Sequence, residues 1–351
     1  MMKKVLKVGI IGTGWISNQH INGYLQCDHV EIAAVADINE NAAREVMRKY
    51  NLDCKYYSDY KKLLANSEID AISICVPNAF HSEVTIAAAM AGKHIMAEKP
   101  FVSSIEEAKK SLKAIKENGV KCAVGYHRRF NPLYREMKRL INKGDLGRVF
   151  FAQSDYIHNF SDLPIISWAL KKEFNPSVFH AGGGHCVDMI RYLVNDEIAE
   201  VCAFVDNSTC PECETEAQTI AIFRFQNGQL GKVTSICPNV ITPFTFNVEV
   251  YGTKGTFKNN KLILDSFPDF RSKKQSEAYA VYPEWMPDNT PGITEPWDIE
   301  IKEFVNWVLN DDEKTDLCTA QDAVRAAEAC WAAVISNAEK RIVKLPLIDF
   351  V

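Results

Sequence analysis

The stretch VGIIGTGWIS, residues 8–17, joins a short apolar run to a pair of glycines and to the beginning of a helical pattern. Gly12 and Gly14 allow a ligand to approach the backbone closely, and the N-terminus of the following helix offers unpaired N–H donors. Ser17 stands where the third glycine of a G-x-G-x-x-G pattern is usual, so the motif takes its meaning from its surroundings. The stretch predicts that a dinucleotide pyrophosphate binds between a first strand and a first helix.

An acidic residue at the end of the second predicted strand supports this interpretation. Asp37 follows Gly14 by 23 residues, close to the spacing that places a carboxylate on the adenosine ribose. Such a carboxylate accepts hydrogen bonds from the ribose hydroxyls and repels a 2′-phosphate, so we expect NAD as the cofactor in preference to NADP. Arg44 is too far along the next helix to be an obvious phosphate ligand unless the fold brings it round. The alternative is a glycine turn with an incidental Asp. The loop residues expected to contact the cofactor are Gly12, Thr13, Gly14, Trp15 and Ile16.

The first third of the chain alternates between continuous apolar runs and amphipathic helical segments. The runs are typical of strands buried on both faces of a parallel sheet. The ends of the helices are marked by Ser104 with Glu107, which form a capping box, and by Gly92 and Gly119 at C-terminal caps. This alternation predicts a doubly wound α/β domain that ends near residue 125. We expect its strands at residues 7–11, 30–36, 71–76, 94–97 and 121–125.

The pattern then changes to longer strands of alternating polarity. The turn sequences FQNGQL (225–230) and YGTKGTF (251–257) favour an antiparallel sheet with one covered face. A length of 351 residues, about twice that of a usual domain, also favours two domains. We expect strands at 147–157, 199–206, 215–225, 228–236 and 244–252. Helices are expected at 132–144, 296–310 and 319–340.

Composition excludes some classes of partner. The chain has 40 basic and 45 acidic side chains and a net charge of -5, which favours neither nucleic acid nor an anionic membrane. No stretch approaches the roughly 18 apolar residues of a membrane span, and Lys7 interrupts the only run that resembles a signal peptide. We therefore expect a cytoplasmic protein.

The cysteines are scattered along the chain. Eleven cysteines without a secretory signal predict reduced, mostly buried thiols. Cys210 and Cys213 form a lone C-x-x-C, which lacks the second pair that a structural zinc site needs. We interpret this segment as a plain surface loop and expect no metal site.

Polar residues follow two of the predicted parallel strands, at the edge where open α/β sheets bind ligands. A lysine held between a strand end and a proline, as Lys99 is, has little freedom, and a partly desolvated ammonium beside NAD is suited to moving a proton. An ordinary surface lysine is the alternative. The strand-end residues expected to contact the cofactor are Val76, Pro77, Asn78, His81, Glu98 and Lys99.

The stretch HAGGGHCVDMIRYL, residues 180–193, places three glycines before His185 and then continues as an apolar helical pattern. No strand of the parallel set precedes it, which argues against a phosphate loop, and partner ligands for a metal are missing. We interpret the glycines as room for the substrate and the nicotinamide, with His185 at the beginning of a helix. Asp188 shares the helical face of His185 and is expected to fix the tautomer of its ring or the start of the helix.

Several of these motifs, in this order, resemble the Gfo/Idh/MocA oxidoreductases, a family that includes glucose–fructose oxidoreductase and inositol dehydrogenases. They are GIIGTGWIS with a following His20, CVPNAFH, AEKP, GYHRRFNP, GDLGRV, GGGHCVD, YGTKGTF and KRIVKLP, and they extend over nearly the whole chain. The resemblance implies a Rossmann domain over residues 1–126 with a doubly wound parallel sheet. It also implies a substrate-binding and oligomerisation domain over 127–351, with a large, mainly antiparallel sheet through which dimers or tetramers pack.

The resemblance also implies roles for individual residues. Lys99 matches the lysine that contacts the nicotinamide ribose and the reacting hydroxyl, in a bond to Pro100 that is often cis, and Glu98 matches its neighbour on the cofactor side. His185 matches the general acid/base. Many members carry an Asp four residues before this histidine, where this chain has Ala181.

The position of Ala181 leaves a vacancy with several candidate replacements. His180 could supply the missing group, as could the loop 154–174, which offers Asp155, Tyr156, His158 and Trp168. A carboxylate or phosphate of the substrate could also fill the space. Trp168 and Trp285 could stack on a sugar ring, although core packing is an equal alternative. The residues expected to bind the substrate are Lys99, Tyr126, Asp155, His158, Trp168, His180 and His185.

The expected function is hydride transfer between NAD and a secondary hydroxyl of a sugar, cyclitol or sugar derivative, with Lys99 and His185 as catalytic residues. Two alternatives belong to other classes. One is glycoside hydrolysis or elimination assisted by a retained NAD, without net change in the cofactor. The other is a non-catalytic NAD-binding sensor, against which the presence of both Lys99 and His185 argues.

Overall fold

The structure, a computed structural model, describes residues 5–161, 166–238, 240–266, 280–281, 296–310 and 315–348. The chain divides into two compact units: a first unit of Met1–Phe130 with Thr294–Val324, and a second unit of Asn131–Ile293 with Arg325–Val351. The units differ from the predicted ranges because the segment 294–324 folds with the first unit. The functional roles of the two ranges stay predictions, and Trp285 lies outside the described residues.

A seven-stranded sheet forms the centre of the first unit, in the order β15-β6-β5-β4-β1-β2-β3. All neighbours are parallel except β15, which runs antiparallel to β6. The five predicted strands are confirmed, and β3 and β15 are additions at the two edges. The bounds are β1 Leu6–Ile11, β2 Val30–Ala36, β3 Lys55–Tyr57, β4 Ala71–Ile74, β5 His94–Ala97, β6 Cys122–Val124 and β15 Cys318–Thr319.

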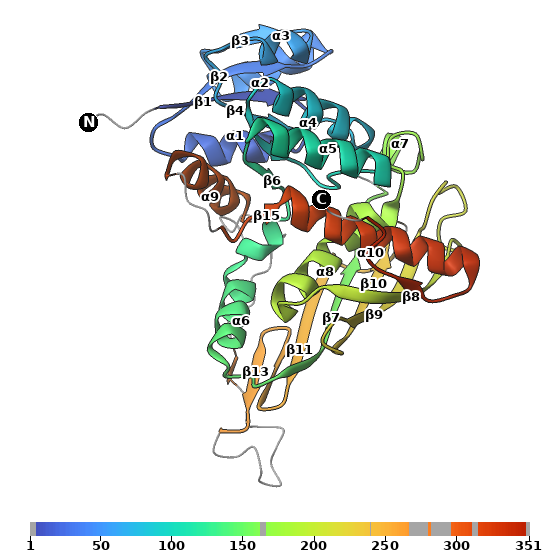
Figure 1. Cartoon of the computed structure of the whole chain (residues 1–351). Helices are drawn as coiled ribbons and strands as arrows, with labels where there is room; N and C mark the ends of the chain where they lie inside the picture. Colours follow the sequence, from blue (N-terminus) through green and yellow to red (C-terminus); the bar gives the residue numbers. More distant parts are fainter. Residues whose placement is uncertain are drawn as a thin grey trace. The chain divides into compact units, whose positions relative to one another are not determined.

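The helices of the first unit cover the faces of this sheet (Figure 1). Helix α1 connects β1 to β2, toward one edge of the sheet, and α4 connects β4 to β5, toward the other edge. Because such crossovers are right-handed, the two helices cover opposite faces of the sheet. The ends of β1 and β4 are therefore the point at which ligands bind in such sheets. The helices are α1 Ser17–Leu25, α2 Glu40–Lys49, α3 Tyr60–Leu64, α4 His81–Met90, α5 Ile105–Asn118 and α9 Trp297–Asn310, with short 3-10 turns η1 Asn78–Phe80 and η2 His127–Phe130.

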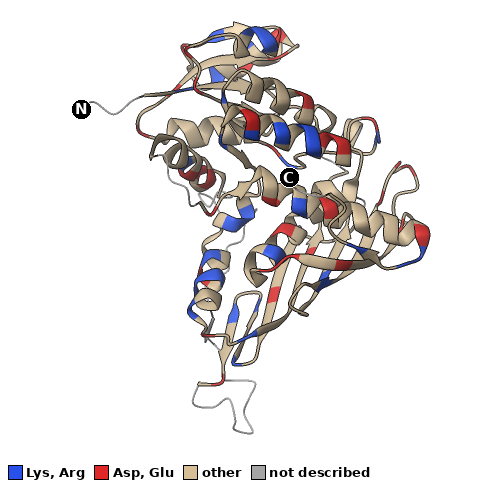
Figure 2. Ribbon diagram, viewed as in Figure 1, with Lys and Arg blue, Asp and Glu red and all other residues tan. Residues whose placement is uncertain are grey.

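Helix α5 shows why these segments form helices. Ser104 caps its N-terminus by accepting from the backbone N–H of Glu107 at 3.2 Å, as the capping box predicts. Gly119 ends it in the left-handed conformation with a φ of 62°. Its outward surface carries charges of both signs (Figure 2), while Ala108, Ser111 and Ala114 are buried. Among the described residues, no helix is both long and apolar enough to span a bilayer.

The second unit contains a nine-stranded sheet in the order β14-β13-β12-β11-β7-β10-β9-β8-β16. Neighbouring strands are antiparallel except β7 and β10, so the sheet is mainly antiparallel, as predicted. The strands are β7 Val149–Ile157, β8 Ile198–Asp206, β9 Gln218–Phe225, β10 Leu230–Ile236, β11 Thr245–Gly252, β12 Gly255–Lys258, β13 Lys261–Leu264, β14 Ala280–Val281 and β16 Val343–Lys344. The helices are α6 Pro132–Lys143, α7 Ile166–Ala169, α8 Val178–Val194 and α10 Ala320–Glu339, whose first turns belong to the first unit.

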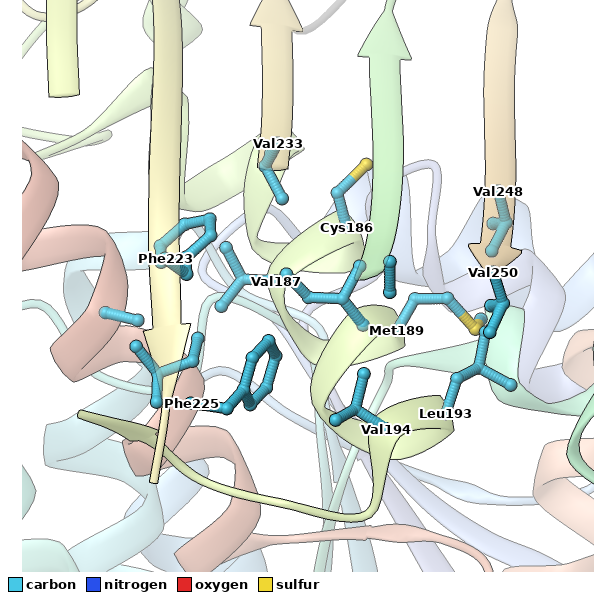
Figure 3. Close-up of a cluster of buried hydrophobic side chains, with 14 of the residues drawn as sticks. Cys186, Val187, Met189, Leu193, Val194, Phe223, Phe225, Val233, Val248 and Val250 are labelled. Carbon is cyan, nitrogen blue, oxygen red and sulfur yellow. The ribbon is translucent and has the colours of Figure 1, made fainter. Parts of the chain in front are cut away.

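Helix α8 packs its apolar side chains against one face of this sheet (Figure 3). Val187 and Met189 on the helix belong to the same buried cluster as Phe223, Val233 and Val250 on the strands. The opposite face of the sheet leaves several apolar side chains exposed. They are Phe204, Ile220, Ile222 and Leu230.

The three glycines lie inside this helix, which corrects the prediction that His185 begins it. The helix begins at Val178, after Ser177 caps it by accepting from the backbone N–H of His180, so His185 lies two turns further on. A Cβ on Gly182 would lie 2.8 Å from the ring of Tyr156, and one on Gly183 would lie 2.6 Å from Phe179. These two glycines therefore allow the helix to pack tightly against Tyr156 and Phe179, and the room that they give to a ligand stays a prediction.

Candidate active site

The glycine loop after β1 has one glycine that the fold requires and one that it does not. Gly12 has a φ of 89°, and a Cβ there would lie 2.5 Å from the carbonyl oxygen of Cys75. A Cβ on Gly14 would meet no protein atom within 4 Å. Helix α1 begins after Ile16 without a side-chain cap, and the N–H groups of its first residues donate to the backbone carbonyls of Gly14, Trp15 and Ile16 in the turn that precedes it. The loop thus leaves open space at a helix N-terminus, which suits a pyrophosphate.

Asp37 is fastened to this loop. Its Oδ2 accepts from the backbone N–H of Thr13 at 2.7 Å and from the Thr13 hydroxyl at 2.8 Å. Its Oδ1 accepts from the backbone N–H of Asn39 at 2.8 Å. The carboxylate is therefore held at the end of β2, next to the glycine pair, where the sequence predicts a contact with ribose.

Two exposed apolar side chains accompany this carboxylate. Trp15 is 58% exposed, and its ring lies 5.9 Å from that of Trp297 in an edge-to-face arrangement. Ile38, directly after Asp37, is 96% exposed. Ile38 was not among the predicted cofactor residues, although an exposed apolar residue directly after a strand-end Asp offers a surface on which a flat ring can pack.

His81 holds two strand-end loops together. Its Nδ1 lies 2.7 Å from the carbonyl oxygen of Pro100, and its Nε2 lies 2.8 Å from that of Val76. Burial lowers the pKa of this imidazole, although the two carbonyls oppose that change. Both ring nitrogens face the backbone, so the imidazole holds these loops in place, and the contact of His81 with the cofactor stays a prediction.

Glu98 belongs to a buried charged group that contacts the backbone of Lys99. Its Oε1 lies 3.1 Å from His20 Nε2, and its Oε2 accepts from the backbone N–H of Lys99 at 3.1 Å. The other ring nitrogen of His20 lies 3.0 Å from the hydroxyl of Ser73, which contacts Tyr24. Glu98 is thus a support for the backbone of Lys99, a role that the sequence did not assign.

The charges of this pair follow from its contacts. Burial disfavours the charged form of His20, but Cys75 and Glu98 outweigh it and raise the pKa of His20 well above 6.5. Burial also opposes ionisation of Glu98, yet its contacts with His20 and Lys99 lower the pKa of that carboxyl. The pair is therefore an imidazolium and a carboxylate. The side chain of Lys99 is half-buried, its bond to Pro100 is cis, and Tyr126 is buried at the end of β6.

In the second unit, Tyr156 contacts both a side chain of α8 and a side chain just after the end of β7. The rings of His185 on α8 and Tyr156 on β7 are nearly parallel, with centroids 6.3 Å apart. The hydroxyl of Tyr156 lies 3.1 Å from Nδ1 of His158. His185 is almost fully buried. His158 was predicted here, whereas Tyr156 was named only as one of several residues in its loop.

Three predicted substrate residues are directed elsewhere in the second unit. Asp155 lies on the opposite face of the sheet from Tyr156, because successive side chains of a strand alternate, and it pairs with Lys232 at 3.5 Å. His180 contacts Trp331 on α10, with ring centroids 6.1 Å apart. Trp168 packs against a small apolar cluster. The contacts of these three residues therefore direct them away from the ring of Tyr156.

The C-x-x-C segment is less exposed than predicted. All eleven cysteines are free thiols. Cys210 and Cys213 are buried in the cluster that contains Phe160, Val178 and Cys237, so the description as a plain surface loop is wrong for the two sulfurs. Burial raises the pKa of Cys210 to about 11, which makes it a poor nucleophile. No group of three or more metal-ligating side chains occurs in the parts of the chain that the structure describes.

Comparisons with known proteins agree with this architecture. Residues 6–126 match a family model described as the oxidoreductase family with an NAD-binding Rossmann fold, and residues 134–258 match the GFO/IDH/MocA C-terminal domain. The uncharacterized oxidoreductase YrbE of Bacillus subtilis is 30% identical over 259 residues, which are 73% of this chain and 74% of that protein. The scyllo-inositol 2-dehydrogenase (NAD(+)) of the same organism is 27% identical over 95% of both chains.

Solved structures show the same fold. A levoglucosan dehydrogenase in complex with NADH and levoglucosan superposes with a TM-score of 0.85 at 24% identity, over 98% of this chain and 100% of that one. A scyllo-inositol dehydrogenase from Lactobacillus casei superposes with a TM-score of 0.78 at 21% identity. The predicted combination of a Rossmann sheet with a large, mainly antiparallel sheet is confirmed.

Proposed function

Because the chain belongs to the Gfo/Idh/MocA oxidoreductase family, whose N-terminal domain is an NAD-binding Rossmann fold, we propose that it oxidises a secondary hydroxyl of a sugar or cyclitol. The reverse reduction is the same chemistry. Relatives named inositol 2-dehydrogenase and levoglucosan dehydrogenase support this class of substrate. The observation that carries the proposal is the open space at Gly14, beside the anchored carboxylate of Asp37.

These residues fit NAD. The loop from Gly12 to Ile16 would receive the pyrophosphate, because Gly14 leaves open space in front of α1, and Asp37 would accept from the adenosine ribose. The strand ends at Val76–Asn78 and at Lys99 would line the remainder of the cofactor. When bound, NAD supplies the carbon that accepts or donates the hydride.

We propose that Lys99 and His185 together remove the proton of the reacting hydroxyl. The ammonium of Lys99 donates a hydrogen bond to the reacting hydroxyl, and the imidazole of His185 accepts the proton that leaves it. The bond from the Lys99 backbone to Glu98 fixes the starting point of the lysine side chain. Tyr156, which contacts His158, offers a hydroxyl beside His185 and takes part in binding the substrate in place of the carboxylate that Ala181 lacks.

The test is turnover with NAD and a panel of sugars and cyclitols, followed by the absorbance of the reduced cofactor. Lys99→Met and His185→Asn are each expected to reduce kcat by about a hundredfold or more, the usual contribution of proton transfer. Lys113→Met, which removes an exposed lysine on α5, is the matched control. Undiminished kcat in Lys99→Met would refute the role of that lysine. Glycoside cleavage without net reduction of NAD would identify the hydrolytic alternative instead.

We also propose that the second unit assembles into a homo-oligomer through the uncovered face of its sheet. Phe204 on β8 is paired directly with Ile220 on β9, and Ile222 lies on the same face two residues further on. Phe204 is 72% exposed and its partners are about half exposed, an apolar patch of the kind that marks protein interfaces. The cytoplasmic location stays a prediction.

A further inference from the structure

The buried ring of His81 lies between two hydrogen-bond acceptors. Its Nδ1 is 2.7 Å from the carbonyl oxygen of Pro100 and its Nε2 is 2.8 Å from that of Val76, both ordinary hydrogen-bond distances. A carbonyl oxygen can only accept, so each ring nitrogen must carry a proton for both bonds to form. A neutral imidazole has one N–H group, which leaves the lone pair of its other nitrogen facing a carbonyl oxygen. The arrangement in the structure is therefore that of an imidazolium.

The two carbonyls belong to loops that the proposed site uses. Val76 lies in the loop after β4, which continues to Asn78, and Pro100 follows Lys99 after β5. His81 is the first residue of α4 and contacts both loops. When the ring loses one proton, it releases one of them, either the loop of Val76 or the loop of Lys99. The second proton on His81 is therefore what holds both loops at once.

The surroundings of the ring oppose its second proton in part. Burial lowers the pKa of His81, while the carbonyls of Pro100 and Val76 raise it. Two charged side chains face the ring: Glu98 favours the imidazolium and Lys99 opposes it. Glu83, in the first turn of the same helix, accepts from the hydroxyl of Tyr60. Because the net direction is a pKa below 6.5, the ring of the free protein releases its second proton in the mildly acidic range.

We propose that His81 is a positioning residue whose second proton fastens the loop of Val76 to the loop of Lys99, and that NAD binds to this protonated form. The inference rests on the proposed NAD site, because it takes both loops as walls of that site. A cofactor that needs both loops in place stabilises the imidazolium. By linkage, binding of the cofactor then takes up a proton, and a rise in pH weakens the binding.

The test is the number of protons taken up when NADH binds, measured by calorimetry at about pH 6–7 in buffers of different ionisation enthalpy. The wild type should take up as much as about one proton, and its Kd should rise by as much as about tenfold per pH unit. His81→Asn keeps a donor toward Pro100 and His81→Gln keeps one toward Val76, but neither side chain titrates, so both should lose the proton uptake. His29→Asn is the matched control, because it removes an exposed histidine and suits the left-handed backbone there, and it should behave as the wild type.

Several results would overturn the inference and can be told apart. If the wild type binds NADH without taking up protons, binding does not favour the imidazolium, and this result needs no variant that folds. If the uptake persists in either His81 variant, the proton belongs to another group. If the wild type binds neither NADH nor NAD, the proposed function itself fails, and the inference with it. Nitrogen NMR of labelled histidine rings is the second measurement: a single protonated nitrogen on His81 in the NADH complex would also refute the inference.

Discussion

At the scale of single residues, alanine at the two glycines of the first loop should have different effects, on stability at one position and on cofactor binding at the other. Gly12→Ala should lower the free energy of unfolding by more than about 1–2 kcal/mol, because it adds a collision with the Cys75 carbonyl to the cost of a left-handed backbone. Gly14→Ala should leave the melting temperature unchanged and weaken NADH binding, because its Cβ would enter space that the protein leaves open. Thermal denaturation and NADH titration of both variants check this. Equal destabilisation by the two substitutions would contradict it.

The buried pair of His20 and Glu98 predicts a particular dependence of stability on pH. The pKa of His20 is raised above 6.5, so its contribution is complete below that pH and is lost as pH rises through the folded value. The pKa of Glu98 is lowered from 4.5, so its contribution is complete above that pH and is lost on acidification. The destabilisation caused by His20→Gln should therefore be largest between about pH 4.5 and 6.5 and should shrink at higher pH.

Chemical denaturation of the wild type and His20→Gln across this range measures that difference. Glu98→Gln provides the complementary variant, whose effect should decline on the acid side. A destabilisation by His20→Gln that stays constant up to pH 9 would show that the imidazole is neutral in the folded protein, because a neutral ring does not release a proton as the pH rises.

At the scale of elements, helix α8 was the hardest to predict. Three consecutive glycines disfavour a helix, so the sequence pattern did not indicate that α8 begins before them. The hydroxyl of Ser177 caps the helix at its actual N-terminus. Packing overrides this local preference, because Gly182 and Gly183 lie against Tyr156 and Phe179. The parallel strands were predictable because short apolar runs there alternate regularly with amphipathic helical segments. Strand β3 lies at the edge of the sheet with side chains that are exposed or half-buried, so it lacks the apolar run that marks the other parallel strands.

This packing predicts that a normally favourable substitution is harmful. Alanine in place of an exposed helical glycine usually stabilises a helix by about 1 kcal/mol. Gly183→Ala should instead destabilise the protein by about 1–3 kcal/mol, because its Cβ would press on Phe179 and Ser235. Gln321→Ala, at an exposed position of α10, is the control and should change stability by less than about 0.5 kcal/mol. Urea denaturation distinguishes the two, and a stabilised Gly183→Ala would refute the packing argument.

At the scale of the whole chain, the candidate site was predictable in its cofactor half more than in its substrate half. Positions such as Gly12, Asp37 and Lys99 follow directly from the ends of parallel strands, a rule that the sequence pattern reveals. Asp155 and Tyr156 differ by one position in a strand, and only the register decides which of them lies beside His185. Helix α9 packs on the first unit through the contact of Ile301 with Gly23. These residues are far apart in the sequence, so no local pattern predicts this contact.

The uncovered face of the second sheet leads to a prediction about assembly. Introducing charge with Phe204→Glu and Ile222→Glu places carboxylates on neighbouring strands of one apolar patch, so burying that patch against another copy becomes unfavourable. The wild type should have a mass by light scattering of at least twice the chain mass of 39.5 kDa, and the double variant should approach 39.5 kDa. Met90→Glu, which changes an exposed apolar side chain on α4, should leave the assembly intact. A monomeric wild type, or a double variant that still assembles, would rule out this face as the interface.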